Sequence, residues 1–153
     1  IVLGLQEIHK NNIIHRDLKP SNILLINGIV KIGDFGLSKN IEHTQIKFLT
    51  DGKPHRNMTG EMGSYLYSSP EQLLGEDYDY RTDIYSLGII LFEMLSDFDT
   101  EMEKNIEIVK LKNNDGIYYT GPEVPFIKLL TKKDFTQRPN TSKILDILQA
   151  NHT

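Results

Sequence analysis

The chain has 153 residues, 39% of them hydrophobic and 25% charged, which is the balance of an ordinary globular domain with a sizeable core. Its formal net charge of −4 gives no basic field for nucleic acid, and the absence of cysteine excludes disulfides and Cys-rich zinc sites. A signal peptide is not recognisable, and the longest apolar stretch, at 84–95, is too short to span a bilayer. We therefore expect a cytoplasmic protein without a nucleic-acid partner.

The first twelve residues, IVLGLQEIHKNN, predict the last turns of an amphipathic helix. Ile1, Leu5 and Ile8 recur at helical spacing. No capping residue precedes Ile1, so we expect the natural helix to begin upstream of this chain.

The segment HRDLKPSN at 15–22 places five kinds of polar or charged side chain in eight residues. Two apolar runs follow it on either side of Asn27 and Gly28, a pair that predicts a two-residue hairpin turn within 23–33. The hairpin leads directly into the triplet DFG at 34–36. The charged loop and the DFG aspartate are therefore expected to lie close together.

The rest of the chain is predicted to be a long loop followed by helices. The stretch 37–68 lacks clear periodicity and is rich in turn formers, which indicates a loop. From Tyr80 the pattern becomes helical, and the apolar residues of 84–95 lie almost all round the helix, which is typical of a buried central helix. Shorter helices are expected near 101–112, 123–131 and 140–150.

Four side chains of the charged loop and the DFG triplet suit phosphoryl transfer. Asp17 is a candidate general base, and Lys19 is placed to balance charge on a transferring group. Asn22 and Asp34 offer the oxygen ligands that Mg²⁺ prefers. Phosphoryl transfer needs this kind of positioning and charge neutralisation more than covalent chemistry. Each residue alone would have only about a 10% chance of such a role, because single motif residues are weak evidence.

The order of these residues resembles the eukaryotic protein kinases. H-R-D-L-x-x-x-N, then a hairpin, then D-F-G is the kinase signature, and SPE at 69–71 resembles the end of the activation segment. The resemblance covers 1–150 and implies a mainly α fold: a kinase C-terminal lobe, with a helical bundle around a buried central helix and a small β-hairpin by the catalytic loop. The glycine-rich loop, lysine and glutamate of the N-terminal lobe are not found, so we expect that lobe to lie outside this chain.

The resemblance implies ATP and Mg²⁺ as cofactors and gives each site residue a role. Asp17 would orient or deprotonate the substrate hydroxyl, and Lys19 would contact the γ-phosphate. Asn22 and Asp34 would hold Mg²⁺, and Leu24 would form the floor under the adenine. A lysine two residues after the catalytic aspartate is the pattern of serine/threonine kinases.

Structural partners follow from the same resemblance. His15 and Phe35 would belong to the stacked apolar spine of the lobe. Asp83 matches the aspartate that holds the catalytic-loop backbone, and Arg138 matches the arginine that pairs with Glu71.

The resemblance also implies regulatory residues in and after the long loop. Thr59 lies where an activating threonine is expected, and its phosphate would pair with Arg16. The alternative is that Thr59 is an ordinary solvated loop residue. Ser64 takes the place of the usual threonine before the substrate platform, and Ser69 replaces the usual alanine, a small-for-small change.

Within the kinases, the chain is similar to those that phosphorylate the alpha subunit of translation initiation factor 2, especially the haem-regulated and endoplasmic-reticulum-stress types. The similarity rests on GSYLYSSPEQ, YSLGIILFEML and TEMEK; one departure is Asp97 where proline is common. It implies that Thr100 and Glu103 dock this substrate. Their T-x-x-E spacing is also a capping box, which is a sufficient explanation by itself.

Two functions from different classes remain open at this point. The first is an ATP-dependent serine/threonine kinase acting on the initiation factor, whose N-terminal lobe, and any dimer contacts, lie outside this chain. The second is a truncated, non-catalytic lobe that acts as a docking or decoy module. The presence of all four phosphotransfer residues favours the first.

Overall fold

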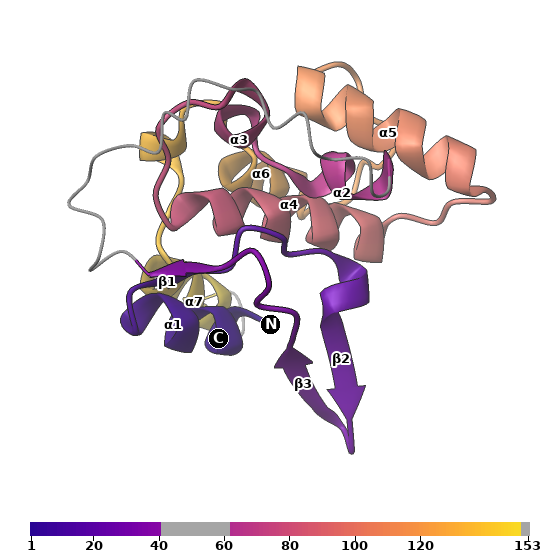
Figure 1. Cartoon of the computed structure of the whole chain (residues 1–153). Helices are drawn as coiled ribbons and strands as arrows, with labels where there is room; N and C mark the ends of the chain where they lie inside the picture. Colours follow the sequence, from indigo (N-terminus) through magenta and orange to yellow (C-terminus); the bar gives the residue numbers. More distant parts are fainter. Residues whose placement is uncertain (41–61, 151–153) are drawn as a thin grey trace.

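The computed structural model describes residues 1–40 and 62–150, which form a helical bundle with one projecting β-hairpin (Figure 1). This confirms the mainly α lobe. The elements are α1 Val2–Lys10, β1 Ile13–Ile14, η1 Pro20–Asn22, β2 Ile23–Ile26, β3 Ile29–Ile32, β4 Lys39–Asn40, α2 Met62–Tyr67, α3 Pro70–Leu74, α4 Arg81–Leu95, α5 Glu101–Asn113, α6 Val124–Leu130, η2 Phe135–Gln137 and α7 Thr141–Ala150. Within the described ranges, no helix has the length and apolar character needed to cross a membrane.

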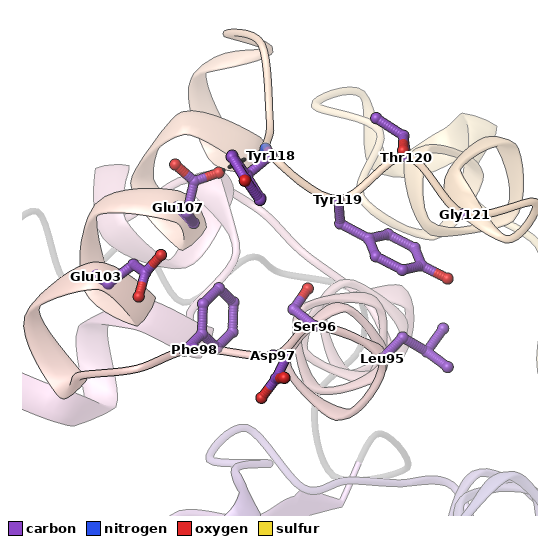
Figure 2. A pocket seen from close by; sticks show the side chains of 10 residues that line it. All are labelled: Leu95, Ser96, Asp97, Phe98, Glu103, Glu107, Tyr118, Tyr119, Thr120 and Gly121. Atoms are coloured by element: carbon purple, nitrogen blue, oxygen red, sulfur yellow. Dashed lines mark hydrogen bonds between the residues drawn. The ribbon is translucent and has the colours of Figure 1, made fainter.

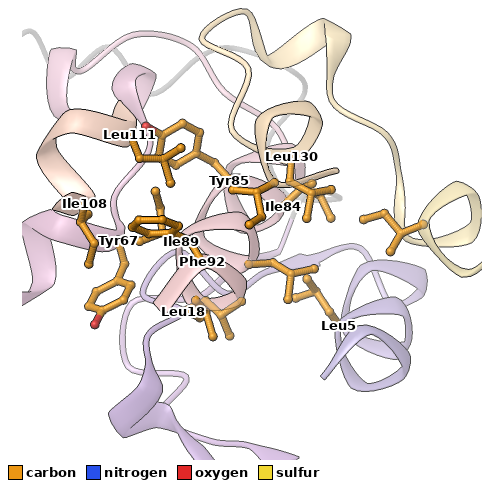
Figure 3. Packing of buried hydrophobic residues seen from close by; sticks show 14 residues of the cluster. Leu5, Leu18, Tyr67, Ile84, Tyr85, Ile89, Phe92, Ile108, Leu111 and Leu130 are labelled. Atoms are coloured by element: carbon orange, nitrogen blue, oxygen red, sulfur yellow. The ribbon is translucent and has the colours of Figure 1, made fainter. Parts of the chain in front are cut away.

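Helix α4 is the centre of the bundle, as its nearly all-round apolar pattern predicts. Every residue from Thr82 to Ile90 is buried. Figure 3 shows its apolar side chains enclosed by residues of other elements, including Leu5, Leu18, Ile108 and Leu130. Only the last turn reaches the surface, where Met94 is exposed. Burial on all sides makes α4 the scaffold on which the loops are placed.

The packing of α6 on α4 depends on a glycine. A Cβ atom at Gly88 would lie 2.7 Å from Thr131 Cγ2 and 2.8 Å from Leu130 Cβ. The missing side chain therefore lets the end of α6 approach the backbone of α4 closely. Overpacking at such a contact is destabilising.

A buried ion pair joins the start of α3 to the segment before α7. Arg138 donates to both carboxylate oxygens of Glu71, at 2.5 and 2.8 Å, and both residues are 3% exposed. The remaining guanidinium N–H groups donate to the carbonyls of Arg81, Lys132 and Lys133. The expected pairing of these two residues is thus confirmed, and the charges are fully compensated, as a buried pair requires.

The predicted hairpin forms as β2 and β3. The strands pair antiparallel with Ile23 opposite Ile32 and Ile26 opposite Ile29. Asn27 and Gly28 both have positive φ, at 52° and 77°, as a type I′ turn requires. The hairpin projects from the bundle (Figure 1), so most of its apolar side chains remain exposed.

The prediction of a continuous loop over 37–68 is wrong at both ends of that stretch. Residues 39–40 form β4, which pairs antiparallel with β1, and α2 occupies Met62–Tyr67. Local sequence does not favour either element, because each depends on a distant partner. Lys112 of α5 donates to the carbonyls of residues 65, 66 and 68 at 2.8–3.3 Å, which satisfies the end of α2. The helices predicted near 101–112, 123–131 and 140–150 are confirmed as α5, α6 and α7.

Replacing Arg138 by methionine is expected to lower the free energy of unfolding by about 3–5 kcal/mol, because Glu71 is left as an uncompensated buried charge. Urea unfolding followed by circular dichroism measures the change. Arg81→Met is the matched control. Its pair with Asp79, at 3.4 Å, is partly exposed, and its other contacts are a hydrogen bond of 3.4 Å to the Phe135 carbonyl and the rings of Tyr80 and Phe135, so its loss should cost clearly less than the loss of Arg138. Equal effects of the two substitutions would contradict a special role for the buried pair.

Candidate active site

The charged loop at 15–22 is attached to the buried helix α4 through one carboxylate. Asp83 is 1% exposed. Its Oδ2 accepts a hydrogen bond from the backbone N–H of His15 and its Oδ1 accepts one from that of Arg16, both at 2.9 Å. Oδ2 also lies 2.8 Å from Nε2 of His9 on α1. The expected role of Asp83 in holding the loop backbone is thus confirmed in this geometry.

These bonds hold an unfavourable backbone conformation. Arg16 has a φ of 74°, in the left-handed region. A non-glycine residue held in such a conformation typically costs about 1–3 kcal/mol and persists only where its surroundings fix it. The conformation turns the chain immediately before Asp17 and so sets the direction in which that side chain leaves the loop.

His15 connects the loop to the DFG segment. The ring is fully buried, and its Nε2 lies 2.8 Å from the carbonyl oxygen of Gly33. Because a carbonyl can only accept, Nε2 donates, and Nδ1 is left to accept from the N–H of Asp17 at 3.3 Å. The Phe35 ring lies edge-on to the imidazole, 5.1 Å between centroids. The expected stacking of these two residues is confirmed.

Three of the four predicted phosphotransfer residues are in direct contact. Lys19 Nζ lies 3.2 Å from Asp17 Oδ2. The amide nitrogen of Asn22 donates to the Asp17 carbonyl at 2.7 Å and lies 3.4 Å from Oδ2. Asp17 is therefore fixed from two sides, with a cation next to its carboxylate.

The fourth residue, Asp34, is brought beside the others by the backbone. Gly33 N donates to the carbonyl of Asn22 at 2.8 Å, which places the residue after Gly33 next to the loop. Asp34 has a φ of 55°, and its Oδ1 accepts a hydrogen bond from Gly36 N at 3.3 Å. The residue is exposed, so its carboxylate is accessible to a ligand. With the Asn22 nitrogen committed to Asp17, the Asn22 amide oxygen is the end that would bind a cation.

This donor set fits Mg²⁺. One carboxylate and one amide oxygen are hard ligands, and Mg²⁺ usually takes few protein ligands, with water and phosphates as the rest. In the described part of the chain there is no cluster of three or more histidine, cysteine or acidic residues that could hold a metal by itself. The site therefore suits a metal that arrives with a phosphate ligand.

Leu24 lies on β2, next to the DFG segment, and is 48% exposed. Its Cδ1 is 3.8 Å from the position of a Cβ at Gly33. Leu24 thus presents an apolar surface beside Asn22 and Asp34, which is compatible with the predicted floor under an adenine. Ile26 and Ile29, a cross-strand pair on the same face of the hairpin as Leu24, are also exposed, so this apolar surface extends along the hairpin.

Arg16 points to the DFG side of the loop. Its Nη1 donates to the carbonyl of Leu37 at 3.1 Å, and its guanidinium lies 5.6 Å from the centre of the Tyr78 ring. Burial raises the pKa of Tyr78, although the nearby Arg16 cation opposes this shift. The predicted phosphate partner, Thr59, lies outside the described residues. The backbone of Ser64 is part of α2, but its side chain is not among the parts that the structure describes.

Sequence analysis missed a further contact with the loop. Gln72 of α3 donates through Nε2 to the carbonyl oxygen of Arg16 at 3.0 Å. Its Oε1 accepts from Ser69 N, in a capping box at the start of α3. The S-x-x-Q spacing of SPEQ is a visible signal for the cap. No local pattern indicates the contact with Arg16, which is 56 residues away.

The predicted docking residues lie at the start of α5. Thr100 Oγ1 accepts from Glu103 N at 3.1 Å, which confirms the first half of the capping box. Glu103 reaches back at 2.9 Å to Asp99 N, one residue before the position that the motif predicts. Both residues are therefore used in capping, and this capping leaves one oxygen of the Glu103 carboxylate uncommitted.

Glu103 also lines a pocket of about 300 Å³. Figure 2 shows Glu103 and Glu107 on α5 with Asp97 and Phe98 on the facing segment. Hydrogen bonds from Lys110 and from the N–H of Tyr118 lower the pKa of Glu107 against the opposing effect of burial. Glu107 is neutralised by Lys110, but the carboxylates of Asp97 and Glu103 and several aromatic rings still make this pocket suitable for a cationic side chain.

Helix α5 is in turn fixed to the segment that precedes α3. Besides its three carbonyl contacts, Lys112 lies 5.9 Å from the centre of the Tyr85 ring, and burial lowers its pKa to about 8. Tyr67 donates to Glu93, which also pairs with Lys104 of α5 at 3.2 Å. These contacts therefore join helix α5, which lines the pocket, to the segment 65–68 that precedes α3.

Comparison with known proteins identifies the family of the chain. A family model described as the protein kinase domain matches residues 1–147. The chain is 39% identical to eukaryotic translation initiation factor 2-alpha kinase 1 of Mus musculus, in an alignment that covers 95% of this chain and 25% of the relative. It is 40% identical to eukaryotic translation initiation factor 2-alpha kinase 3 of Rattus norvegicus, over 74% of this chain and 10% of the relative.

A third relative is the interferon-induced, double-stranded RNA-activated protein kinase of Mus musculus, which is 39% identical over 97% of this chain and 27% of its own length. The chain thus spans about a quarter or less of the length of these curated relatives. The kinase-domain model covers nearly all of the chain, and the loop, the DFG segment and Asp83 have the expected geometry. The chain therefore belongs to the protein kinase domain family.

Proposed function

We propose that this chain is the C-terminal lobe of a serine/threonine kinase that transfers the γ-phosphoryl group of ATP to a protein hydroxyl. The observation that carries the proposal is the contact of Asp17 with Lys19 and Asn22 on a loop that Asp83 holds in place. A solvated surface loop would have no need of a buried carboxylate to fix its backbone. Phosphoryl transfer does need this rigidity, because positioning supplies most of the rate.

Each residue then has a defined task. Asp17 accepts a hydrogen bond from the substrate hydroxyl and takes its proton as the bond to phosphorus forms. Lys19, which neutralises Asp17 in this structure, would turn to the transferred phosphate and offset its charge. Asn22 and Asp34 would hold Mg²⁺, which would supply positive charge to offset the charge of the phosphate groups.

Residues outside 1–153 would supply the other half of the nucleotide site. The sequence contains no G-x-G-x-x-G loop. The exposed apolar surface of Leu24, Ile26 and Ile29 is of the kind that normally packs against another domain or ligand. By this proposal the chain without an N-terminal lobe binds ATP weakly and transfers no phosphate.

We further propose that the substrate is the alpha subunit of translation initiation factor 2. Two of the relatives are named as kinases of this protein. The acidic and aromatic pocket beside Glu103 supports a docking role for the start of α5, since it would receive a basic side chain of the folded substrate. Lys112 of α5 donates hydrogen bonds to the carbonyls of residues 65 and 68, which hold α5 against the segment before α3. These bonds support a fixed distance between the pocket and the catalytic loop.

Replacing Asp17 by asparagine, in the complete kinase, is expected to lower kcat by about 10²–10⁴-fold, because the proton acceptor is lost while the shape is kept. Phosphorylation of the initiation factor with radiolabelled ATP measures the rate, and thermal unfolding checks that the fold is unchanged. A folded variant that keeps more than a tenth of the wild-type rate would remove Asp17 from this role. It would also favour a non-catalytic docking module.

Replacing Glu103 by glutamine is expected to raise KM for the folded initiation factor several-fold and to leave a short generic peptide unaffected. The amide oxygen can still accept from Asp99 N, so the cap and the stability are preserved. Only the charge facing the pocket is lost, which changes binding of the folded substrate and not chemistry.

Glu101→Gln is the matched control for this experiment. Glu101 is an exposed carboxylate on the same turn of α5, paired with Lys104 and outside the pocket. It should leave KM for the folded factor unchanged. If Glu103→Gln behaves like Glu101→Gln, capping is the whole role of Glu103.

A further inference from the structure

The backbone on both sides of Arg16 is held, and by two different elements. Asp83 of α4 binds the Arg16 N–H at 2.9 Å, and Gln72 of α3 binds the Arg16 carbonyl at 3.0 Å. Between these two bonds lies the left-handed residue whose φ is 74°. The Asp83 bond fixes the peptide group before Arg16. The Gln72 bond fixes the peptide group after it, which is the one that carries Asp17.

The side chain of Gln72 has only one orientation that satisfies its neighbours. Its Oε1 accepts from Ser69 N at 3.1 Å and from Ser69 Oγ at 3.2 Å. Ser69 Oγ also lies 2.6 Å from Thr82 Oγ1, and both hydroxyl side chains are buried. Because Ser69 donates to Gln72, Thr82 donates to Ser69. The oxygen of Gln72 is thus committed to α3, and its NH₂ group faces Arg16.

We propose that Gln72 is a positioning residue for the catalytic Asp17. It acts by holding the Arg16 carbonyl, and so it fixes the peptide plane from which the Asp17 side chain leaves the loop. Without this bond, the peptide between residues 16 and 17 keeps only the longer hydrogen bond from Asp17 N to His15 Nδ1, at 3.3 Å, while Asp83 still holds the N–H of Arg16. The orientation of this peptide is then less firmly fixed. The proposal rests on the proposed function, and it makes α3, at the end of the activation segment, a direct support of the catalytic loop.

Substitution by glutamate separates this role from capping. A glutamate at position 72 keeps an oxygen that accepts from Ser69 N, and a negative charge in the first turn of a helix is favourable. It has no N–H to donate to Arg16. The second carboxylate oxygen would face the Arg16 carbonyl oxygen and repel it. Gln72→Glu is therefore expected to keep the cap, to lower the melting temperature only slightly and to lower kcat on the order of 10-fold. KM for ATP and for protein substrate should be unchanged, as expected for a small misplacement of the catalytic group.

The experiment uses the complete kinase and measures kcat, KM and the melting temperature. Gln149→Glu, an exposed glutamine of α7, controls for the added charge. Ser69→Ala removes the hydroxyl contacts with Thr82 and with Gln72 Oε1, but the Ser69 N–H still holds Gln72 Oε1 and leaves its NH₂ group facing Arg16, so it should affect stability more than kcat. If Gln72→Glu does not fold, Gln72→Met, which has similar length and no donor, takes its place and should show the same loss of kcat.

A second readout does not depend on catalysis. The ¹³C resonance of the Arg16 carbonyl should shift in Gln72→Glu and stay unchanged in Gln149→Glu. A folded Gln72 variant with wild-type kcat and an unshifted Arg16 resonance overturns the proposal and leaves Gln72 as a helix cap. If the wild type itself transfers no phosphate, the proposed function fails, and the Arg16 resonance alone then decides whether Gln72 holds the loop.

Discussion

The site depends on a single carboxylate that is buried in the centre of the bundle. A carboxylate as buried as Asp83 is costly unless hydrogen-bond donors surround it. Three donors do so: two backbone N–H groups of the catalytic loop and the ring of His9. The same hydrogen bonds compensate the buried charge of Asp83 and fix the backbone of the loop. Stability of the core and geometry of the site are therefore coupled.

Helix α4 sets the relative positions of the other elements because its neighbouring residues bind different segments. Thr82 contacts Ser69 at the start of α3, and Asp83 contacts the catalytic loop. Ser86 donates to the carbonyl of Tyr67 at the end of α2, at 2.7 Å. Gly88 admits the end of α6. A helix in a close-packed core cannot rotate or slide freely, so these segments keep a constant spacing.

Much of this arrangement could be predicted from the sequence. The hairpin, the helix pattern after Tyr80 and the residues of the catalytic loop are local signals, read within a few positions. The turn at Asn27 and Gly28 needs only two residues with positive φ, and both are residues that adopt it readily. These local features account for the type of fold and for the identification of the four residues proposed to carry phosphotransfer.

The rest depends on contacts between distant residues, which no local pattern contains. Helix α2 was missed because its final carbonyls are satisfied by Lys112, from another helix. The sequence alone indicates only that Ser69 is a small-for-small replacement of the usual alanine, whereas in the structure its hydroxyl links Gln72 to Thr82. The shift of the Glu103 bond to Asp99 depends on the path of the chain before α5. Motifs identify which residues matter, but they do not show which partners hold them.

The two halves of the site differ in how firmly they are held, and the difference matches their chemistry. The half that would receive the hydroxyl, around Asp17, is fixed by α4, by α3 and by Asn22. The half that would receive the nucleotide, around Leu24 and Asp34, is exposed and is held mainly by the backbone of the hairpin. A proton acceptor must be placed before substrate arrives, because its position determines the rate. The apolar surface under an adenine becomes buried only when the adenine and the structure that covers it are both present, so it can remain exposed before the nucleotide binds. The bundle therefore provides rigidity where the proposed reaction would need it, and its exposed apolar surface is the part that would receive a partner.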